Sequence, residues 1–540
     1  MSSFEHADTL PRVAVLDNAH IGDIRGALGT IRLGDTSRAG WATRLKTLLA
    51  ILGPGLIVMV GDNDAGAFGT YTQAGQNYGT ALLWTMLLLI PVLYVNQEMV
   101  LRLGAVTGVG HGRLIIERFG RFWGTFSVID LFLLNALTIV TEFIGISLAL
   151  DYLGLPKLLG VAAAAVLTMA AAGTGDFRKF ERFSLALVCG SLLLVPIVLM
   201  VHPPVMEIGR DFLLPRLPAG ARLSDVMLLI IAIVGTTVAP WQLFFQQSYV
   251  IDKRITPRFI GYEKVDLWLG IALVVIGAVA MIAFSAAVFG GRPEFGNFTD
   301  AGGISAGLEK YVGKLPGVLF ALALIDASII GASAVSLATA YAVGDVLSLR
   351  HSLHRKPKEA KAFYLVYCGL IALAAALVLL PGTPLGLLTE GVQTLAGVLL
   401  PSATVFLLLL CNDRAVLGPW VNGRWLNLFT GVVIALLLML SIILTASILY
   451  PEMGSATILG ILGGGTVLAI LAGGVAMLTV REKRTPIDRS HRNDWRMPPL
   501  DELAPAKLST ASRLWMIALR GYLIAACGLV VVRVVQLALG

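Results

Sequence analysis

Long apolar segments recur along this chain, and they limit its possible folds more than any other feature. Segments of about 20 residues, enough to cross roughly 30 Å of hydrocarbon as a helix, follow one another through most of the sequence. Hydrophobic residues make up 56% of the 540 positions and charged residues only 14%, which excludes an ordinary soluble domain. Because the apolar segments are continuous rather than alternating, we expect an all-α, polytopic membrane protein and not a barrel.

Hydropathy assigns thirteen candidate spans to the chain. The last of them contains Arg520 and Arg533, so an interfacial helix is an alternative there. The candidate spans are residues 47–73, 79–101, 124–150, 158–175, 183–203, 224–250, 265–290, 316–346, 362–381, 386–411, 425–450, 456–480 and 514–538.

These spans divide the chain into three parts. Residues 1–45 are expected to be a flexible cytoplasmic N-terminal tail, and residues 46–450 a core of eleven helices. Residues 451–540 are expected to form a C-terminal extension with one or two further membrane helices and a basic cytoplasmic loop.

Lys and Arg concentrate in the loops that face inward if the N-terminus is cytoplasmic, and we expect that orientation. We also expect the chain to lie in the plasma (inner) membrane, in contact with lipid. This topology accounts for the net charge of +7 without a nucleic-acid partner, and we expect a monomer. The basic residues of the inward loops are Arg113, Arg118, Arg121, Arg178, Lys179, Arg182, Lys253, Arg254, Arg258, Arg350, Arg355, Lys356, Lys358 and Lys361.

The first span contains the polar stretch "GDNDAGAFG", residues 61–69. Its glycines weaken a helix and permit non-helical backbone. Unwound backbone at membrane depth is tolerated where it lines a cavity, and its free carbonyl oxygens can bind a cation. Asp64 would add the charge that such a site needs.

The sixth span is also interrupted, in "IVGTTVAPWQLFFQQ", residues 233–247, by Gly235 and Pro240. Either interruption alone indicates only a kink or close helix packing. Interruptions at matching positions of two halves, one with a carboxylate, are typical of a secondary transporter with inverted repeats. We therefore expect a leucine-transporter-like 5+5 fold with broken helices 1 and 6.

At these breaks the chain resembles the NRAMP family of divalent-metal transporters. "GPGLIVMVGDNDAGAFG" is similar to the GPG and DPGN motifs of the family's first helix, and "RLGAVTG", residues 102–108, to its RLGVVTG. Ala239-Pro240-Trp241, followed by Gln242, stands where the family's sixth helix carries MPH. The resemblance runs from about Leu48 to about Tyr450.

The resemblance implies an ion site with two replaced ligands. The family's aspartate is kept as Asp64, whereas Ala67 replaces its asparagine and Ala239 its methionine. By the same carry-over, the carbonyl groups of Gly61 and Thr236 are further ligands. Gln393 stands where the tenth helix has a glutamine that faces the site, although a structural hydrogen bond between helices explains it as well.

Loss of the methionine changes the expected metal. A thioether favours transition metals, whereas magnesium prefers oxygen and gives up its water ligands reluctantly. The departure resembles the NRAMP-related magnesium transporter branch. We expect import of magnesium, with manganese also accepted, by alternating access, and no cofactor other than the transported ion.

Proton coupling is expected to be weak or absent. In the family, the relay uses the histidine of MPH and a carboxylate pair in helix 3. Here Trp241 replaces the histidine, and of the pair only Glu142 remains, because the other position is Ile139. None of the seven histidines lies in the middle of a span.

Three acidic residues in spans keep alternative roles. Glu142 is either a residual proton site or a hydrogen-bonded structural group. Asp62 points away from Asp64 on a helix, so it either guards the outer entrance or caps the broken half-helix. Glu98 precedes Arg102 by four residues, which predicts a local ion pair.

Three rival functions stay open. A proton-coupled manganese or iron importer is favoured by Asp64 and Glu142 but disfavoured by Ala239 and Trp241. A transporter of organic solutes could use the same scaffold, yet it would not need Asp64 beside a substrate carboxylate. No GxSxG, HExxH or P-loop pattern indicates an enzyme.

Overall fold

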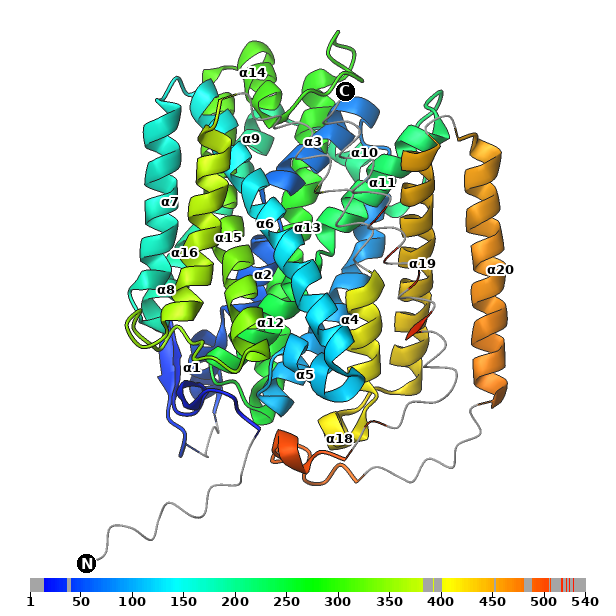
Figure 1. The fold of residues 1–540 in the computed structure, drawn as a ribbon. Coiled ribbons are helices and arrows are strands. Elements are labelled where there is room, and N and C mark those ends of the chain that lie inside the picture. The colour runs from blue at the N-terminus through cyan, green and yellow to red at the C-terminus, as the bar shows by residue number, and fades with distance from the viewer. Residues whose placement is uncertain are drawn as a thin grey trace, which may run out of the picture.

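The chain folds into a bundle of membrane-length helices, with residues of the N-terminal segment packed on one end (Figure 1). This computed structural model describes residues 14–35, 40–381, 392, 401–450, 453–479 and 488–504, together with six isolated positions between 506 and 528. Gln393 and nearly all of the predicted span 514–538 lie outside the described residues.

The α-helices are α1 (Trp41–Ile51), α2 (Pro54–Val60), α3 (Ala65–Tyr78), α4 (Trp84–Thr107), α5 (His111–Phe119), α6 (Arg121–Tyr152), α7 (Lys157–Gly173), α8 (Phe177–Gly190), α9 (Leu194–Val201), α10 (Val205–Leu213), α11 (Leu223–Thr237), α12 (Pro240–Asp252), α13 (Ile260–Phe289), α14 (Ala301–Tyr311), α15 (Lys314–Val346), α16 (Lys361–Leu379), α18 (Arg414–Leu417), α19 (Arg424–Leu449) and α20 (Ser455–Thr479). Residues Pro401–Cys411 are also helical. Short 3-10 helices occur at Asn18–His20, Ser191–Leu193, Pro257–Phe259, Gly418–Trp420 and Leu500–Glu502.

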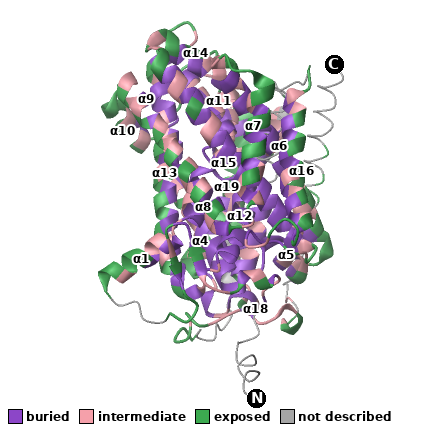
Figure 2. Cartoon of the chain, turned by 90° about the vertical axis from the view of Figure 1, so that its left-hand side faces the viewer, coloured by how far each residue is buried: buried purple, intermediate pink, exposed green. Residues whose placement is uncertain are grey.

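Among the described residues, eight helices are long and apolar enough to cross a membrane, or nine spans if α1 and α2 count as one bent pair. The thirteen predicted spans exceed this number partly because the first is divided into three helices and α7 has only 17 residues. The chain is thus an all-helical, multi-pass integral membrane protein. Buried residues fill the centre of the bundle, and the outer helices expose one face (Figure 2).

The first span is broken twice. The expected break lies between α2, which ends at Val60, and α3, which begins at Ala65. A second, unexpected break separates α1 from α2, which are bent by 47°. It follows from the chain itself, because Gly53 adopts a φ of 151° and Pro54 starts the next helix.

The sixth span breaks at one point, between α11 and α12. Val238 and Ala239 leave the helical region, and Pro240 becomes the first residue of α12. The prediction that Gly235 takes part in the interruption is wrong, because Gly235 stays inside α11. Proline alone suffices, since it disfavours helical backbone in the residue before it.

Small residues hold the broken first span against α13. A Cβ atom added at Gly55 in α2 would lie 2.6 Å from the backbone nitrogen of Leu267. One added at Gly75 in α3 would lie 2.3 Å from the carbonyl oxygen of Ile282. Glycine thus lets both halves of the span approach α13 at backbone distance, as is common between membrane helices.

The N-terminal segment is ordered where it is described, so the expectation of a flexible tail is wrong for residues 14–35. Two short antiparallel strands, β1 (Ile24–Gly26) and β2 (Gly29–Ile31), pack on α1. Glu181 of α8 accepts a hydrogen bond from the Ala27 nitrogen at 2.5 Å. Arg355, before α16, pairs with Asp17 at 2.5 Å. The segment therefore joins helices from both halves of the bundle.

Candidate functional site

The break in the first span is fixed by hydrogen bonds of two side chains, Asn63 and Asp64. Asp64 caps α3, because its Oδ1 accepts from the Ala67 nitrogen at 2.9 Å. Asn63 is anchored to α13 through its Nδ2, which donates to the Val274 carbonyl oxygen at 3.2 Å. Four residues, 61–64, thus form a defined loop between two half-helices.

This loop frees the carbonyl group of Gly61. In a continuous helix, that carbonyl would accept from the nitrogen of residue 65. Here the Ala65 nitrogen donates instead to Glu142 Oε2, at 3.1 Å. Glu142 of α6 therefore stabilises the broken conformation and leaves the Gly61 oxygen available.

The second break frees the carbonyl group of Thr236 in a different way. Its helical partner would be the nitrogen of residue 240, which is proline and has no N–H group. The neighbouring Thr237 is held by its Oγ1, which donates to the Ile233 carbonyl at 2.6 Å. Pro240 therefore cannot supply the helical hydrogen bond to the Thr236 carbonyl oxygen at the end of α11.

The two breaks lie against each other. A Cβ atom added at Gly66 would lie 3.2 Å from Asp64 Oδ1 and 3.9 Å from Thr236 Oγ1. On the other side, a Cβ added at Gly61 would lie 3.7 Å from the Trp241 ring. Three of the sequence-predicted ligand positions, Gly61, Asp64 and Thr236, are thus brought into one region.

Tyr71 and Gly331 complete the walls of this region. The Tyr71 hydroxyl is 2.7 Å from Thr237 Oγ1, which ties α3 to α11. In α15, a Cβ added at Gly331 would lie 2.9 Å from Glu142 Cδ and 3.0 Å from Asp64 Cβ. Sequence reasoning did not identify either residue, because neither Tyr71 nor Gly331 stands out from the helix around it.

The two alanines that replace family ligands lie at the breaks, but they offer only a methyl group. Ala67 is fully buried in the first turn of α3, and Ala239 is extended and 9% exposed between α11 and α12. Trp241 is buried and packs edge-on against Phe245. Ile139, also buried, lies on α6 three residues before Glu142.

Asp62 does not cap the broken half-helix, because Asp64 is the residue that caps α3. Its other expected role, at an outer entrance, stays a prediction. Asp62 lies in the loop between α2 and α3. It is fully buried, and Gln242 Nε2 donates to its Oδ1. Gln242 in turn accepts from Gln97 Nε2 at 3.0 Å. Gln97 was missed because an isolated amide in a span usually forms only a structural hydrogen bond.

The region is acidic and has no basic partner. Among the described residues, no ion pair involves Asp62, Asp64 or Glu142, although other buried acids have one. Glu98, for example, pairs with Arg102 at 2.9 Å as predicted. The described part of the chain also has no cluster of three or more His, Cys, Asp or Glu suited to a metal ion. A cation in this region would depend on one carboxylate and on backbone and amide oxygens.

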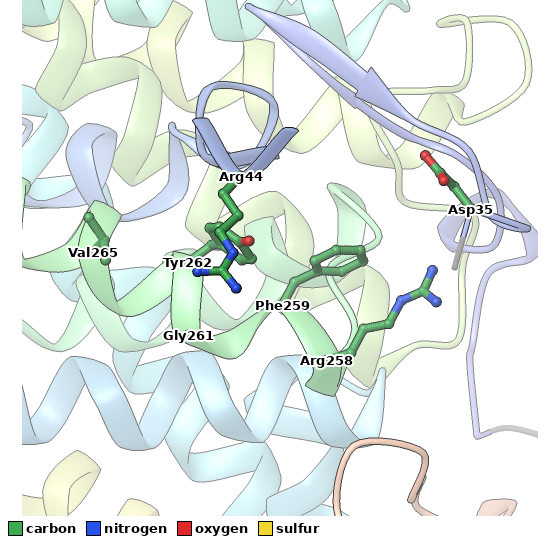
Figure 3. Close-up of a pocket in the computed structure, with 7 residues that line it drawn as sticks. All are labelled: Asp35, Arg44, Arg258, Phe259, Gly261, Tyr262 and Val265. Carbon is green, nitrogen blue, oxygen red and sulfur yellow. The ribbon is translucent and has the colours of Figure 1, made fainter. Parts of the chain in front are cut away.

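The described histidines belong to other parts of the protein than the two breaks. His111 begins α5, His202 follows α9, and His491 follows α20. His20 belongs to the ordered N-terminal segment and contacts His351, which lies with His354 in the connection between α15 and α16. A surface pocket between α1 and the start of α13 is also separate from the breaks (Figure 3). Its lining residues are Asp35, Arg44, Arg258, Phe259, Gly261, Tyr262 and Val265.

Comparison with known proteins gives a family match over most of the chain. The model of the Nramp family, described as natural resistance-associated macrophage protein-like, matches residues 55–447. A protein named divalent metal cation transporter MntH from Ralstonia nicotianae is 31% identical over 396 residues, covering 70% of this chain and 86% of the relative. A protein of the same name from Deinococcus radiodurans is 28% identical over 432 residues, covering 76% and 93%.

Solved structures share the fold. A crystal structure of the manganese transporter from Eremococcus coleocola aligns with a TM-score of 0.63 over 85% of this chain and 97% of that one, at 19% sequence identity. The expected fold, an all-helical transporter with broken helices 1 and 6, is therefore confirmed.

Proposed function

This chain belongs to the Nramp family, and we propose that it is a secondary transporter that imports divalent metal ions, chiefly magnesium, by alternating access. The observation that carries the proposal is the pair of opposed helix breaks beside one carboxylate. Asp64 supplies a negative charge, and the loop after α2 and Pro240 leave the Gly61 and Thr236 carbonyl groups free. Gln393 is proposed as a further ligand. Relatives named as divalent metal cation transporters support this reading.

Magnesium is proposed because the donor set contains oxygen and no sulfur. Ala239, where a thioether would favour manganese or iron, offers no ligand atom. Ala67 likewise offers only a methyl group where an amide would bind the ion directly. An ion that keeps several water ligands fits such a site, and magnesium is reluctant to lose its water. Manganese accepts the same oxygen ligands and is proposed as a second substrate.

We further propose that proton movement is coupled to transport weakly or not at all. Trp241 fills the position beside the second break with an indole ring, which does not titrate. The inward flux is then driven by the membrane potential and the ion gradient. The proposed orientation places the N-terminal segment in the cytoplasm, in a monomer of the inner membrane, and no catalytic role is proposed.

A proton-coupled manganese importer is the second candidate, and Glu142 favours it. This carboxyl group lies beside Asp64 and the Ala65 nitrogen, and its Oε1 has no hydrogen-bond partner among the described residues. A proton could reach that oxygen when the ion binds at Asp64. The absence of a second titratable group at Ile139 and Trp241 makes this the weaker candidate.

The substitution Ala239→Met tests the proposed selectivity. A thioether at the second break should strengthen manganese binding, because sulfur is a softer ligand, and weaken magnesium binding by occupying space used by its water. Uptake into liposomes should show the ratio of manganese to magnesium kcat/KM rising by about tenfold or more. Ala239→Leu, which fills the same space without sulfur, is the control. An equal change in both variants would contradict the proposed role of the missing sulfur.

A further inference from the structure

A chain of hydrogen bonds crosses three elements on the α2 side of the breaks. Gln97 Nε2, on α4, donates to Gln242 Oε1, on α12, at 3.0 Å. Gln242 Nε2 donates to Asp62 Oδ1 in the loop after α2, and it also approaches the Thr237 carbonyl at 3.4 Å. All three side chains are completely buried. The amide nitrogens of Gln97 and Gln242 are therefore both used as donors within this series of hydrogen bonds.

Within the described part of the protein, the oxygens at the two ends of this series of hydrogen bonds have no partner: Asp62 Oδ2 and Gln97 Oε1 are buried and accept no hydrogen bond there. Gln246, one turn further along α12 than Gln242, likewise has no partner among the described residues at either of its polar atoms. An unpaired buried polar atom costs about 1–3 kcal/mol, and more if it is charged. Natural proteins retain such atoms where a ligand, an ion or water pairs with them.

The missing partner must carry positive charge or donate hydrogen bonds. Both end atoms are acceptors, one of them on a carboxyl group, and no described basic side chain pairs with Asp62. A divalent cation, or the water molecules bound to it, meets this requirement. The missing partner would lie next to Asp64, on the side of Asp64 that faces α4 and α12.

We propose that Asp62, Gln97 and Gln242 form a second cation subsite, which the transported ion occupies between Asp64 and the end of the bundle that carries the N-terminal segment. The proposal rests on the proposed function, because it gives the same ion a second resting place. The two sites fill in turn rather than together, since two divalent ions this close repel each other. In this proposal, Asp62 Oδ2 and Gln97 Oε1 accept hydrogen bonds from the water shell of the ion, and Gln242 holds these two side chains in place.

Binding to purified full-length protein tests the subsite. Magnesium and manganese are titrated calorimetrically into wild type, Asp64→Asn, and Asp64→Asn combined with either Asp62→Asn or Gln97→Leu. We expect one ion in wild type, one ion bound at least tenfold more weakly in Asp64→Asn, and no measurable binding in either double variant. Adding Asp130→Asn, which removes a carboxylate of α6 that has no place in the subsite, should leave the residual binding of Asp64→Asn unchanged.

Three results would overturn the subsite. They are loss of all binding in Asp64→Asn, residual binding that survives both double variants, and residual binding that falls equally with Asp130→Asn. Thermal unfolding of each variant identifies those that fail to fold. The two double variants change the two opposite ends of the series of hydrogen bonds, Asp62 and Gln97. Failure of the proposed function is distinguishable, because wild type would then bind or transport neither metal.

Discussion

At the scale of single residues, the candidate site depends on backbone carbonyl groups that have lost their helical hydrogen-bond donors. Pro240 removes the nitrogen that would pair with the Thr236 carbonyl, and Glu142 takes the nitrogen that would pair with the Gly61 carbonyl. Sequence reasoning identified these carbonyl groups through family resemblance. It left the role of Glu142 open, since its contact with Ala65 depends on how α6 packs against the first span.

Gly331 is predicted to be required because no side chain fits between the two acids. A Cβ atom there would lie about 3 Å from both Glu142 and Asp64. Gly331→Ala should therefore destabilise the protein by about 1–3 kcal/mol and greatly reduce transport. Gly369→Ala is the matched control, because Gly369 of α16 has no atom within 4 Å of such a Cβ. Thermal unfolding and uptake are the measurements, and equal behaviour of the two variants would refute the prediction.

At the scale of elements, broken helices were predictable and their exact limits were not. The glycines, acids and proline indicated both breaks, because these residues disfavour a continuous helix locally. The break between α1 and α2 was missed, although Gly53 and Pro54 signal it, because hydropathy joins the two helices into one span. The ordered segment 14–35 was missed for a different reason. Its stability comes from contacts with α1, α8 and residues near α16, which no local pattern reveals.

The break between α11 and α12 is predicted to be required for transport but not for the stability of the fold. In Pro240→Ala, residue 240 regains an N–H group that can pair with the Thr236 carbonyl, so α11 and α12 can join into one helix. We expect unchanged or higher thermal stability together with at least a tenfold loss of uptake. Pro91→Ala is a useful comparison, since Pro91 lies inside a continuous span, α4. Full activity of Pro240→Ala would show that the free carbonyl is not a ligand.

The ordered N-terminal segment and His351 give a pH dependence. Burial lowers the pKa of His351, but the Asp345 carboxylate, 3.0 Å away, outweighs it and raises the pKa to about 9. Stability from this pair is therefore complete below about pH 6.5, the ordinary pKa of histidine, and is lost as the pH rises through 9. Burial raises the pKa of Asp17, but Arg355, two backbone N–H groups and the nearby His20 outweigh it and hold this pKa below its ordinary value. Its contribution is lost only in strong acid.

We therefore expect the Tm of the wild type to fall between pH 6.5 and pH 10 by more than the Tm of His351→Gln, which cannot carry the charge. Differential scanning of both proteins in the same detergent gives the two profiles. Asp17→Asn should lower the Tm throughout this range, since its pair with Arg355 is intact at all of these pH values. Parallel profiles for wild type and His351→Gln would mean that the pair does not stabilise the folded state.

At the scale of the whole molecule, two halves of the bundle each contribute one broken span, and the proposed ion site lies where the breaks meet. The all-helical class followed from composition, because only continuous apolar helices satisfy the backbone in lipid. The contact between the two breaks could be predicted from the matching positions of the interruptions in the sequence. The hydrogen bonds from Gln97 through Gln242 to Asp62 could not be predicted, because they depend on how α4 and α12 face each other.

The most direct measurement is ion uptake by liposomes that contain the purified protein, with internal pH recorded at the same time. Under an inward-negative potential, we predict that magnesium enters, that manganese competes with it, and that internal pH stays constant. Asp64→Asn, in which the site loses its charge, should reduce uptake by about 30-fold or more, as expected for a charged ligand. Entry of manganese alone, with acidification of the interior at a fixed ratio, would contradict the account.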